Sequence, residues 1–184
     1  MTIETDRLRL RAVTEADYEA FLAIVSNPKV ALPAGFQPVK NSFEGHFLIR
    51  QTLHQRWLWG IVVKSTNQFV GTVGLYGKTD DEGRLLHDQR DLGYMLNEAV
   101  WGHGYMSEAV AAALNEAFNR GLTHIWGSYF EDNQRSAHIF KKMGFSFDHQ
   151  LQHNEHDFFA PGKQECFYRL SATDFYQANP MGAS

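Results

Sequence analysis

One segment combines the residue types and the spacing that binding of a phosphate group requires. It reads Trp101-Gly102-His103-Gly104-Tyr105-Met106-Ser107-Glu108-Ala109 and leads into a stretch with helical apolar spacing. The first amides of a helix have no acceptor inside the helix, and the helix dipole makes that end positive. The glycines at positions 102 and 104 let a ligand approach the backbone closely. The segment therefore predicts a phosphate site, although two glycines before a helix are also compatible with a simple tight turn.

Other kinds of chemistry have weaker support in the sequence. The dinucleotide fingerprint Gly-x-Gly-x-x-Gly would need a glycine at position 107, where the chain has Ser107. The run His153-Asn154-Glu155-His156-Asp157 contains possible metal ligands, but its histidine spacing does not match a helical pair and no cysteine supports it. We therefore predict no metal site and interpret the run as a polar hairpin loop. Cys166, the single cysteine, is expected to be a small buried strand residue, because nothing near it in sequence would activate a thiol.

Periodic apolar residues indicate the elements that position these segments. Alternating patterns and short apolar runs predict strands over residues 7–11, 59–64, 69–76, 90–96, 125–130, 145–151 and 165–170. Helical spacing and capping residues predict helices over residues 14–26, 43–56, 106–118 and 134–143, with Phe47 on the apolar side of the second. This order predicts a mixed α/β (α+β) fold in which helices pack on a mixed sheet.

The composition fits one globular domain. The chain has 184 residues, and we expect a single domain over residues 1–172 followed by a ragged tail over residues 173–184. No apolar run approaches the ~20 residues that cross a bilayer, and the acidic first residues do not resemble a signal peptide. These features and the single cysteine predict a cytoplasmic location without a membrane partner. The net charge of −4 argues against nucleic-acid binding and suits a cationic acceptor such as an amine.

Four short motifs in one order give the chain a resemblance to a known family. They are Thr5-Asp6-Arg7-Leu8-Arg9-Leu10-Arg11, Gly93-Tyr94-Met95-Leu96, Trp101-Gly102-x-Gly104-Tyr105-x-Ser107-Glu108-Ala109, and Asn133-x-x-Ser136 followed by Lys142-x-Gly144-Phe145. With them the chain resembles the GNAT superfamily of acyl-CoA N-acyltransferases, and most of all its ribosomal-protein serine/alanine N-terminal acetyltransferases. The superfamily's cofactor loop usually begins with Gln or Arg and ends with Gly or Ala. Trp101 and Met106 depart from that pattern, so the implied grip on the pyrophosphate is by backbone amides.

The resemblance implies a fold, a co-substrate and a set of binding residues. The implied fold is a six- to seven-stranded, mixed, largely antiparallel sheet that is splayed at the centre, with about four helices on its faces. The co-substrate is acetyl-CoA, without a metal, and an amide near Met95 or Leu96 would polarise the acetyl carbonyl. Asn133 would bond the pantetheine arm, or simply cap the following helix, and these roles can coexist. The expected binding residues are Met95, Leu96, Gly102, His103, Gly104, Tyr105, Met106, Ser107, Asn133, Ser136, Phe140 and Lys142.

The resemblance also implies two catalytic side chains. Ser136 is expected to protonate the leaving thiolate, with a solvated helix serine as the alternative interpretation. Glu155 is expected to act through water as the general base, and Glu131 is the alternative. Each of these carboxylates is also compatible with a purely solvated position.

The implied reaction is transfer of an acetyl group from acetyl-CoA to a primary amine. The expected acceptor is the N-terminal α-amine of a protein, such as a ribosomal protein, because an α-amine with a pKa of ~7.7–8.0 loses its proton easily. The alternatives are a small-molecule N-acetyltransferase for a polyamine, an aminoglycoside or an amino acid, and a non-catalytic acyl-CoA-binding module. The helices within residues 14–58 are expected on the acceptor side, and the chain is expected to be a monomer or a homodimer.

Overall fold

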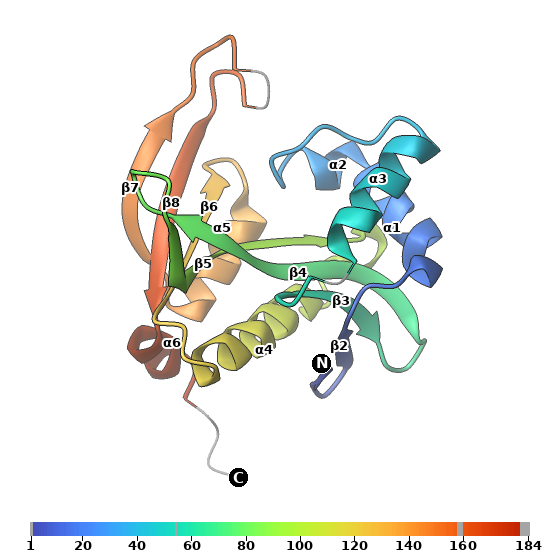
Figure 1. The fold of residues 1–184 in the computed structure, drawn as a ribbon, viewed down its shortest axis with the longest axis horizontal. Coiled ribbons are helices and arrows are strands. Elements are labelled where there is room, and N and C mark those ends of the chain that lie inside the picture. Colours follow the sequence, from blue (N-terminus) through green and yellow to red (C-terminus); the bar gives the residue numbers. More distant parts are fainter. Residues whose placement is uncertain (1, 54, 158–159, 181–184) are drawn as a thin grey trace. The chain divides into compact units, whose positions relative to one another are not determined.

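The structure is a computed structural model that describes residues 2–53, 55–157 and 160–180 (Figure 1). Its strands are β1 (Ile3–Glu4), β2 (Leu8–Arg11), β3 (Leu58–Val63), β4 (Gln68–Thr79), β5 (Leu85–Leu96), β6 (His124–Phe130), β7 (Ser146–Gln152) and β8 (Gln164–Ser171). Its helices are α1 (Tyr18–Val25), α2 (Pro28–Ala31), α3 (Ser42–Thr52), α4 (Tyr105–Asn119), α5 (Gln134–Met143) and α6 (Ala172–Ala178). Two 3-10 turns, η1 (Glu15–Asp17) and η2 (Glu98–Val100), precede α1 and α4.

The strands form a mixed sheet in the order β1-β2-β3-β4-β5-β6-β8-β7. The pairs β1–β2, β2–β3, β3–β4, β6–β8 and β7–β8 are antiparallel, whereas β5 and β6 pair in parallel over Gln89–Asp91 and His124–Trp126. The predicted fold class and the largely antiparallel sheet are therefore confirmed. The additional strand, β1, has two residues, and this is too short for an alternating pattern to be visible in the sequence.

Internal contacts divide the chain into two compact units. The first comprises residues 1–74 and 93–113, and the second comprises residues 75–92 and 114–184. The elements β4, β5 and α4 each contribute residues to both units. Within the described ranges, no helix combines the length and the apolar character that a membrane span needs.

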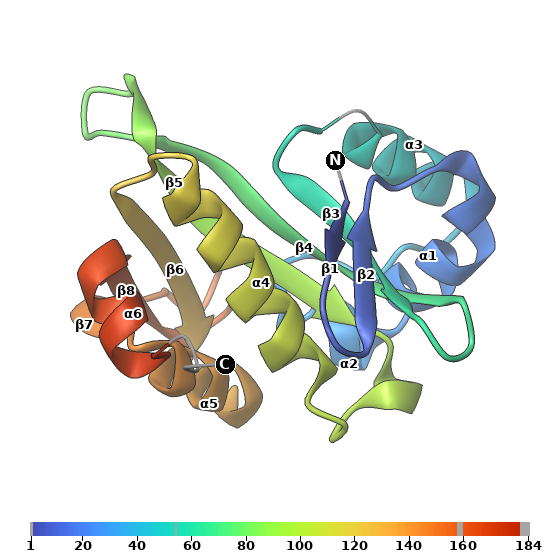
Figure 2. The ribbon, with the colours of Figure 1, turned by 90° about the horizontal axis from the view of Figure 1, so that it is seen from below.

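In the first unit, alternation along β2 decides which side chains are buried. Leu8 and Leu10 are fully buried and pair with β3, while the arginines between and after them are not. The predicted helix start is also confirmed, because the Asp17 carboxylate accepts a hydrogen bond of 2.8 Å from the Thr14 amide. Helices α1 and α3 contact each other and lie side by side next to β2 (Figure 2).

Helix α3 presents a different face to this unit than its sequence predicts. Its buried residues are Gly45 and Ile49, and a Cβ at Gly45 would lie 2.6 Å from Leu22 Cδ1 of α1. Phe47, which is predicted on the apolar side, is 58% exposed, and Phe43 is 81% exposed. Phe47 is two residues from Gly45, about 200° around the helix. The prediction for Phe47 is wrong because the contact with α1 is made at a glycine, and this directs the large side chains away from it.

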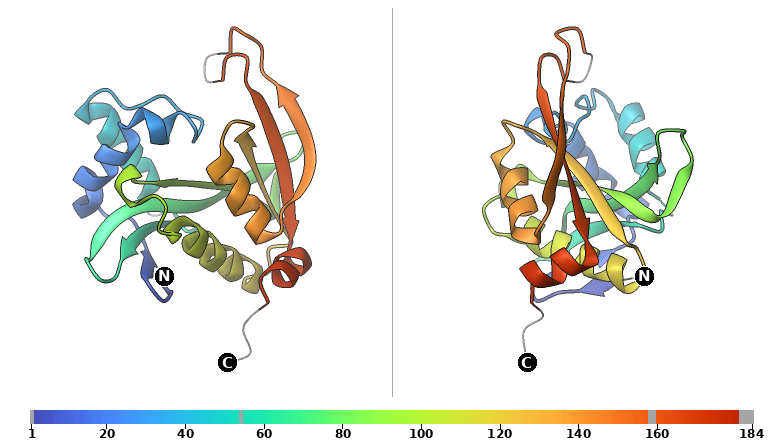
Figure 3. Two further views of the ribbon diagram at one scale, coloured as in Figure 1. Left: turned by 180° about the vertical axis from the view of Figure 1, so that it is seen from behind. Right: turned by 90° about the vertical axis from the view of Figure 1, so that its left-hand side faces the viewer.

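In the second unit, α5 packs on one face of β6 and β8 (Figure 3). The Phe140 ring lies edge-on to Tyr129 of β6 and Tyr168 of β8, with ring centroids 5.1 and 5.5 Å away. Gly127 makes this possible, because a Cβ there would lie 2.7 Å from Phe140 Cζ. Side chains alternate along a strand, so Ser128 lies on the opposite face of β6.

The end of the described chain is helical rather than ragged. Residues 172–178 form α6, whose start is capped by Ser171, since its hydroxyl accepts a hydrogen bond of 3.2 Å from the Asp174 amide. Phe175 is 3% exposed and packs on Phe118 of α4, with ring centroids 5.6 Å apart. The expected tail over residues 173–184 is therefore wrong for α6, and its last four residues lie outside the described ranges. The two aromatic side chains of α6, Phe175 and Tyr176, lie four and five residues after the cap and are too few to give a periodic signal.

Candidate functional site

The loop before α4 has the backbone geometry that the sequence predicts for a phosphate site. Gly102 and Gly104 have φ angles of +80° and +76°, in the left-handed region that favours glycine. The indole Nε1 of Trp101 donates a hydrogen bond of 2.9 Å to the Leu96 carbonyl at the end of β5. The loop is thus tied to the strand before it, and both glycines are required by its conformation.

Backbone amides at the start of α4 are open to a ligand. The Glu108 amide donates to the Gly104 carbonyl at 3.1 Å, and the amides before it have no acceptor inside the helix. Among the described residues, a Cβ built on Gly102 would meet no atom within 4 Å, and one on Gly104 would meet Arg7 Nη2 at 3.5 Å. The open space beside Gly102, the lack of any closer contact than Arg7 beside Gly104 and the positive end of a 15-residue helix fit a phosphate group.

The side chains around this loop leave the backbone as the binding surface. Met106 and Ser107 are both buried. The exposed ring of His103 stacks on Tyr105, with centroids 5.6 Å apart. Met106 departs from the Gly or Ala that usually ends the superfamily's cofactor loop. Its side chain is buried, so the departure does not change the backbone amide at the start of α4.

A charged network that the sequence analysis did not assign holds this loop from the first motif. Glu108 Oε1 accepts hydrogen bonds from Thr5 Oγ1 at 2.6 Å and from the Arg7 amide at 2.9 Å. The Arg7 guanidinium bonds Glu108 Oε2 through Nε at 2.7 Å and the His103 carbonyl through Nη1 at 2.8 Å. Burial raises the pKa of Glu108, but the hydrogen bonds from Thr5 and Arg7 outweigh it, so that pKa lies below its ordinary value. The motifs contained these residues, but their separation by 101 positions gave no sign that they meet.

The end of β5 directs one amide away from its neighbour β4. The Asn97 amide donates to the Val70 carbonyl of β4 at 2.8 Å. Successive peptide groups of a strand point to opposite edges, so the Leu96 amide points away from β4 and the Met95 amide points toward it. Of the two amides expected near an acetyl carbonyl, that of Leu96 has the suitable direction.

Asn133 and Ser136 open α5 in the second unit. Asn133 Oδ1 accepts a hydrogen bond of 3.2 Å from the Ser136 amide, so Asn133 caps the helix. Its Nδ2 group has no hydrogen-bond partner in the part of the chain that the structure describes. Ser136 is 8% exposed and lies on the first turn. The capping alternative for Asn133 is therefore confirmed, and contact with a ligand stays a prediction for both residues.

The later residues of α5 have visible structural roles. The Phe140 ring belongs to the packed core between α5 and the sheet. Lys142 is exposed on the last turn, about 9 Å along the helix from Ser136, where a cation interacts favourably with the helix dipole. Contact with acetyl-CoA stays a prediction for Phe140 and Lys142.

The two candidate bases are both exposed in the second unit. Glu155 lies in the connection between β7 and β8, and a Cβ on Gly162 would lie 2.7 Å from Glu155 Oε2. Gly162, with a φ of +63°, therefore leaves room for this carboxylate. Glu131 follows β6, and its amide donates to the Gln164 carbonyl at 3.0 Å. The solvated positions given as alternatives for both carboxylates agree with the structure.

A third carboxylate, Glu165, joins a chain of polar groups that the sequence analysis missed. Glu165 Oε1 accepts a hydrogen bond of 2.5 Å from Ser128 Oγ, and Glu165 Oε2 lies 2.9 Å from His153 Nε2. His153 Nδ1 lies 3.2 Å from Asp157 Oδ2. Hydrogen bonds to Glu165 and Asp157 raise the pKa of His153 above its ordinary value. These groups come from β6, β8 and the hairpin, so no local sequence pattern connects them.

Cys166 behaves as an ordinary strand residue. Cys166 is partly buried on β8, and burial raises the pKa of its thiol, with smaller contributions from Glu131 and Glu165. Residues 2–53, 55–157 and 160–180 contain no group of three or more His, Cys, Asp or Glu side chains arranged to hold a metal.

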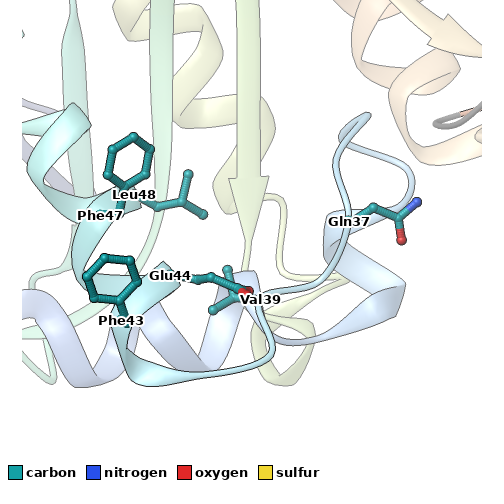
Figure 4. A pocket seen from close by; sticks show the side chains of 6 residues that line it. All are labelled: Gln37, Val39, Phe43, Glu44, Phe47 and Leu48. Carbon is teal, nitrogen blue, oxygen red and sulfur yellow. The ribbon is translucent and has the colours of Figure 1, made fainter.

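A cavity of about 400 Å³ lies in the first unit beside α3. The exposed rings of Phe43 and Phe47 project from the helix, and Gln37 lies on the facing loop (Figure 4). The Glu44 carboxylate accepts hydrogen bonds from the Lys40 amide and from Asn41 Nδ2, both at 2.9 Å. The cavity is therefore mainly apolar, with its carboxylate engaged at the helix start. Its lining residues are Gln37, Val39, Phe43, Glu44, Phe47 and Leu48.

The loop and the fold agree with a comparison of the sequence with known families. A family model described as an acetyltransferase (GNAT) domain matches residues 7–146. The chain belongs to the GNAT acetyltransferase family. A Bacillus subtilis (strain 168) relative, the uncharacterized N-acetyltransferase YoaA, is 30% identical over 149 residues, which cover 78% of this chain and 81% of YoaA. The chain is accordingly a GNAT-type N-acetyltransferase that depends on acetyl-CoA.

Solved structures with low sequence identity share the fold. A GNAT-family acetyltransferase from Bacillus anthracis has a TM-score of 0.78 and 20% identity, covering 93% of this chain and 98% of its own. RimL, a ribosomal L7/L12 α-N-protein acetyltransferase solved in complex with CoA, has a TM-score of 0.75 and 20% identity, with the same coverage of 93% and 98%.

Proposed function

We propose that this N-acetyltransferase binds acetyl-CoA with its pyrophosphate on residues 102–107 and acetylates the N-terminal α-amine of a protein. One observation carries the proposal: two glycines with left-handed backbone conformation precede the N-terminal amides of α4, and the space beside Gly102 is open. The family match covers this loop and extends through both units. Residues 1–172 are accordingly proposed to act as one acetyltransferase domain, as a monomer or a homodimer, in the cytoplasm.

The first unit is proposed to hold the phosphates and polarise the carbonyl. The amides from Gly102 to Ser107 donate to phosphate oxygens, since their direction and the helix dipole both favour an anion. Acetyl-CoA supplies a thioester, whose carbonyl carbon is attacked by the acceptor amine. The Leu96 amide, directed away from β4, donates to the carbonyl oxygen as negative charge develops there.

The second unit is proposed to supply the pantetheine contact and the proton for the leaving group. Asn133 Nδ2 donates to the pantetheine arm while Oδ1 continues to cap α5. The Ser136 hydroxyl gives its proton to the sulfur as the bond from carbon to sulfur breaks. Phe140 and Lys142 are proposed to bind acetyl-CoA from the later turns of α5.

Glu155 is proposed to accept the amine proton through water, with Glu131 as the alternative base. Each is an exposed carboxylate, and exposure allows exchange of the proton with solvent. His153 is poorly suited to this task. Its hydrogen bonds to Glu165 and Asp157 raise its pKa, and this favours the protonated form, which cannot accept another proton. An α-amine needs little help from a base, since its pKa lies within about one unit of neutral pH.

Exposed aromatic rings favour a protein as the acceptor. Phe43 and Phe47 project from α3 beside the mainly apolar cavity. Exposed aromatic residues are typical of surfaces that contact other proteins, whereas polyamines and aminoglycosides require mainly polar and acidic surroundings. RimL, whose fold this chain shares, acts on a protein α-amine by its description, and this supports the same class of acceptor.

A panel of acceptors tests the proposal. Wild-type protein and acetyl-CoA are incubated with N-terminal peptides, polyamines, aminoglycosides and amino acids, and release of the CoA thiol is followed. We expect release with peptides, and the double variant Phe43→Ala/Phe47→Ala should raise the peptide KM severalfold while the acetyl-CoA KM stays the same. Release with small amines alone would support the small-molecule alternative. Binding of CoA without release to any acceptor would support the non-catalytic one.

A further inference from the structure

An acidic side chain at the proposed pyrophosphate site poses an electrostatic problem. Glu108 lies in the first turn of α4. A carboxylate there interacts favourably with the helix dipole, but it also repels an anionic ligand that binds at the same helix end. A pyrophosphate carries two negative charges close together, so an uncompensated Glu108 would weaken its binding.

Arg7 is placed to remove this repulsion. Its guanidinium lies against the carboxylate, with Nη2 and Nε each 2.7 Å from Glu108 Oε2. Its Nη1 group bonds the carbonyl of His103, and its Cζ lies 4.9 Å from the centre of the Tyr105 ring. The guanidinium is therefore held between the loop and the acid, while the Arg7 side chain remains 50% exposed.

Glu108 is held away from the amides of the loop by the same network. Both of its oxygens are occupied, one by Thr5 Oγ1 and the Arg7 amide, the other by the guanidinium. The carboxylate is 18% exposed, so its charge is less screened by water than that of an ordinary surface residue. Its neutralisation must therefore come mainly from Arg7.

We propose that Arg7 is a positioning residue for acetyl-CoA: it neutralises Glu108, so that the N-terminus of α4 presents net positive potential to the pyrophosphate. This inference rests on the proposed site at residues 102–107 and adds a role for the first motif, 95 positions before that loop in the sequence. The role concerns the phosphate end of the ligand and leaves the chemistry at the acetyl group unchanged.

Four variants of the full-length protein test the charge argument, with CoA affinity measured by titration calorimetry. Arg7→Ala should weaken CoA binding about tenfold, because Glu108 is then uncompensated. Glu108→Gln should bind CoA as well as the wild type or better. Arg7→Ala/Glu108→Gln should return to within about threefold of the wild type, since no unpaired acid remains. The control Arg9→Ala removes the exposed ion pair between Arg9 of β2, two residues after Arg7, and Glu4 of β1, and it should leave CoA binding unchanged.

A second readout separates this role from a general loss of structure. S-acetyl-pantetheine carries the thioester but lacks the pyrophosphate, so its KM should be the same for the wild type and Arg7→Ala, while the acetyl-CoA KM rises. If Arg7→Ala does not fold, Arg7→Met, which keeps a long aliphatic side chain without the charge, takes its place.

The outcomes distinguish this inference from the proposed function. A wild-type protein that does not bind CoA would overturn both. CoA binding by the wild type together with unchanged binding by Arg7→Ala would overturn the role of Arg7, and so would a double variant that binds as weakly as Arg7→Ala. Either result would leave the proposed phosphate site at residues 102–107 unaffected.

Discussion

Backbone groups dominate the proposed cofactor site, and few side chains have chemistry to perform. The side chains of Met106 and Ser107 are buried, and a Cβ built on Gly102 would meet no described atom within 4 Å, so the backbone of the loop is the surface that side chains leave uncovered. The main exception is Ser136, a buried hydroxyl at the start of α5. Side-chain substitutions should therefore separate binding from catalysis more cleanly here than at sites where one residue does both.

Ser136→Ala tests the proton donor. Turnover should fall by about 10²-fold, a typical contribution of general acid catalysis, because the leaving thiolate loses its donor. The Kd for CoA should stay within about threefold of the wild type, since the backbone holds the phosphates. Steady-state kinetics and calorimetry measure both quantities, and Ser146→Ala, an exposed serine at the start of β7, is the matched control. Unchanged turnover would remove Ser136 from the mechanism.

Residue roles could be predicted only where the signal is local. The loop was recognised because two glycines and the helix after them are contiguous in sequence, and Asn133 was recognised as a cap for the same reason. Arg7 and Glu108 form an ion pair across 101 positions, and Glu165 meets Ser128 across 37. Such pairs depend on strand register and on the docking of a helix, and neither can be read from one sequence.

At the scale of elements, the sheet and the hairpin bring titratable groups together. β6 and β8 place Ser128 and Glu165 within hydrogen-bond distance, and the hairpin adds His153 and Asp157. The predicted strands and the four longest helices are present with ends within a few residues of those expected. The face of α3 was misjudged because Gly45, which carries no hydrophobic side chain, makes its contact with α1.

The hydrogen bonds of His153 predict that the stability of the folded state depends on pH. The folded-state pKa of His153 is raised by hydrogen bonds to Glu165 and Asp157, so protonated His153 stabilises the folded state. This contribution is fully present below the ordinary histidine pKa of ~6.5 and is lost as the pH rises through the higher folded-state value. The difference in Tm between the wild type and His153→Gln should therefore shrink as the pH rises from about 5.5 to 8.5. A difference that grows with pH would contradict the assignment.

At the scale of the whole molecule, the family match and the proposed chemistry involve residues of both units. The phosphate loop and the Leu96 amide belong to the first, and Asn133, Ser136 and Glu155 belong to the second. The four motifs predicted the family because they follow one another in the superfamily's order along the chain. This order is kept even where single residues, such as Trp101 and Met106, differ from the superfamily's usual pattern. The acceptor could not be predicted in the same way, because the surfaces that would contact it, such as the exposed face of α3, carry no shared motif.

The loop before α4 is the centre of the proposed acetyl-CoA site, and CoA titration of one glycine variant tests its role directly. Gly104→Val places a branched side chain at a φ of +76° and beside the open amides, so CoA binding should fall below detection. Gly83→Val carries comparable backbone strain at a φ of +78° in the turn between β4 and β5, and it should bind CoA as the wild type does. We expect the wild type and Gly83→Val to bind CoA and Gly104→Val not to bind it. A folded Gly104→Val variant that binds CoA with wild-type affinity would contradict this role of the loop.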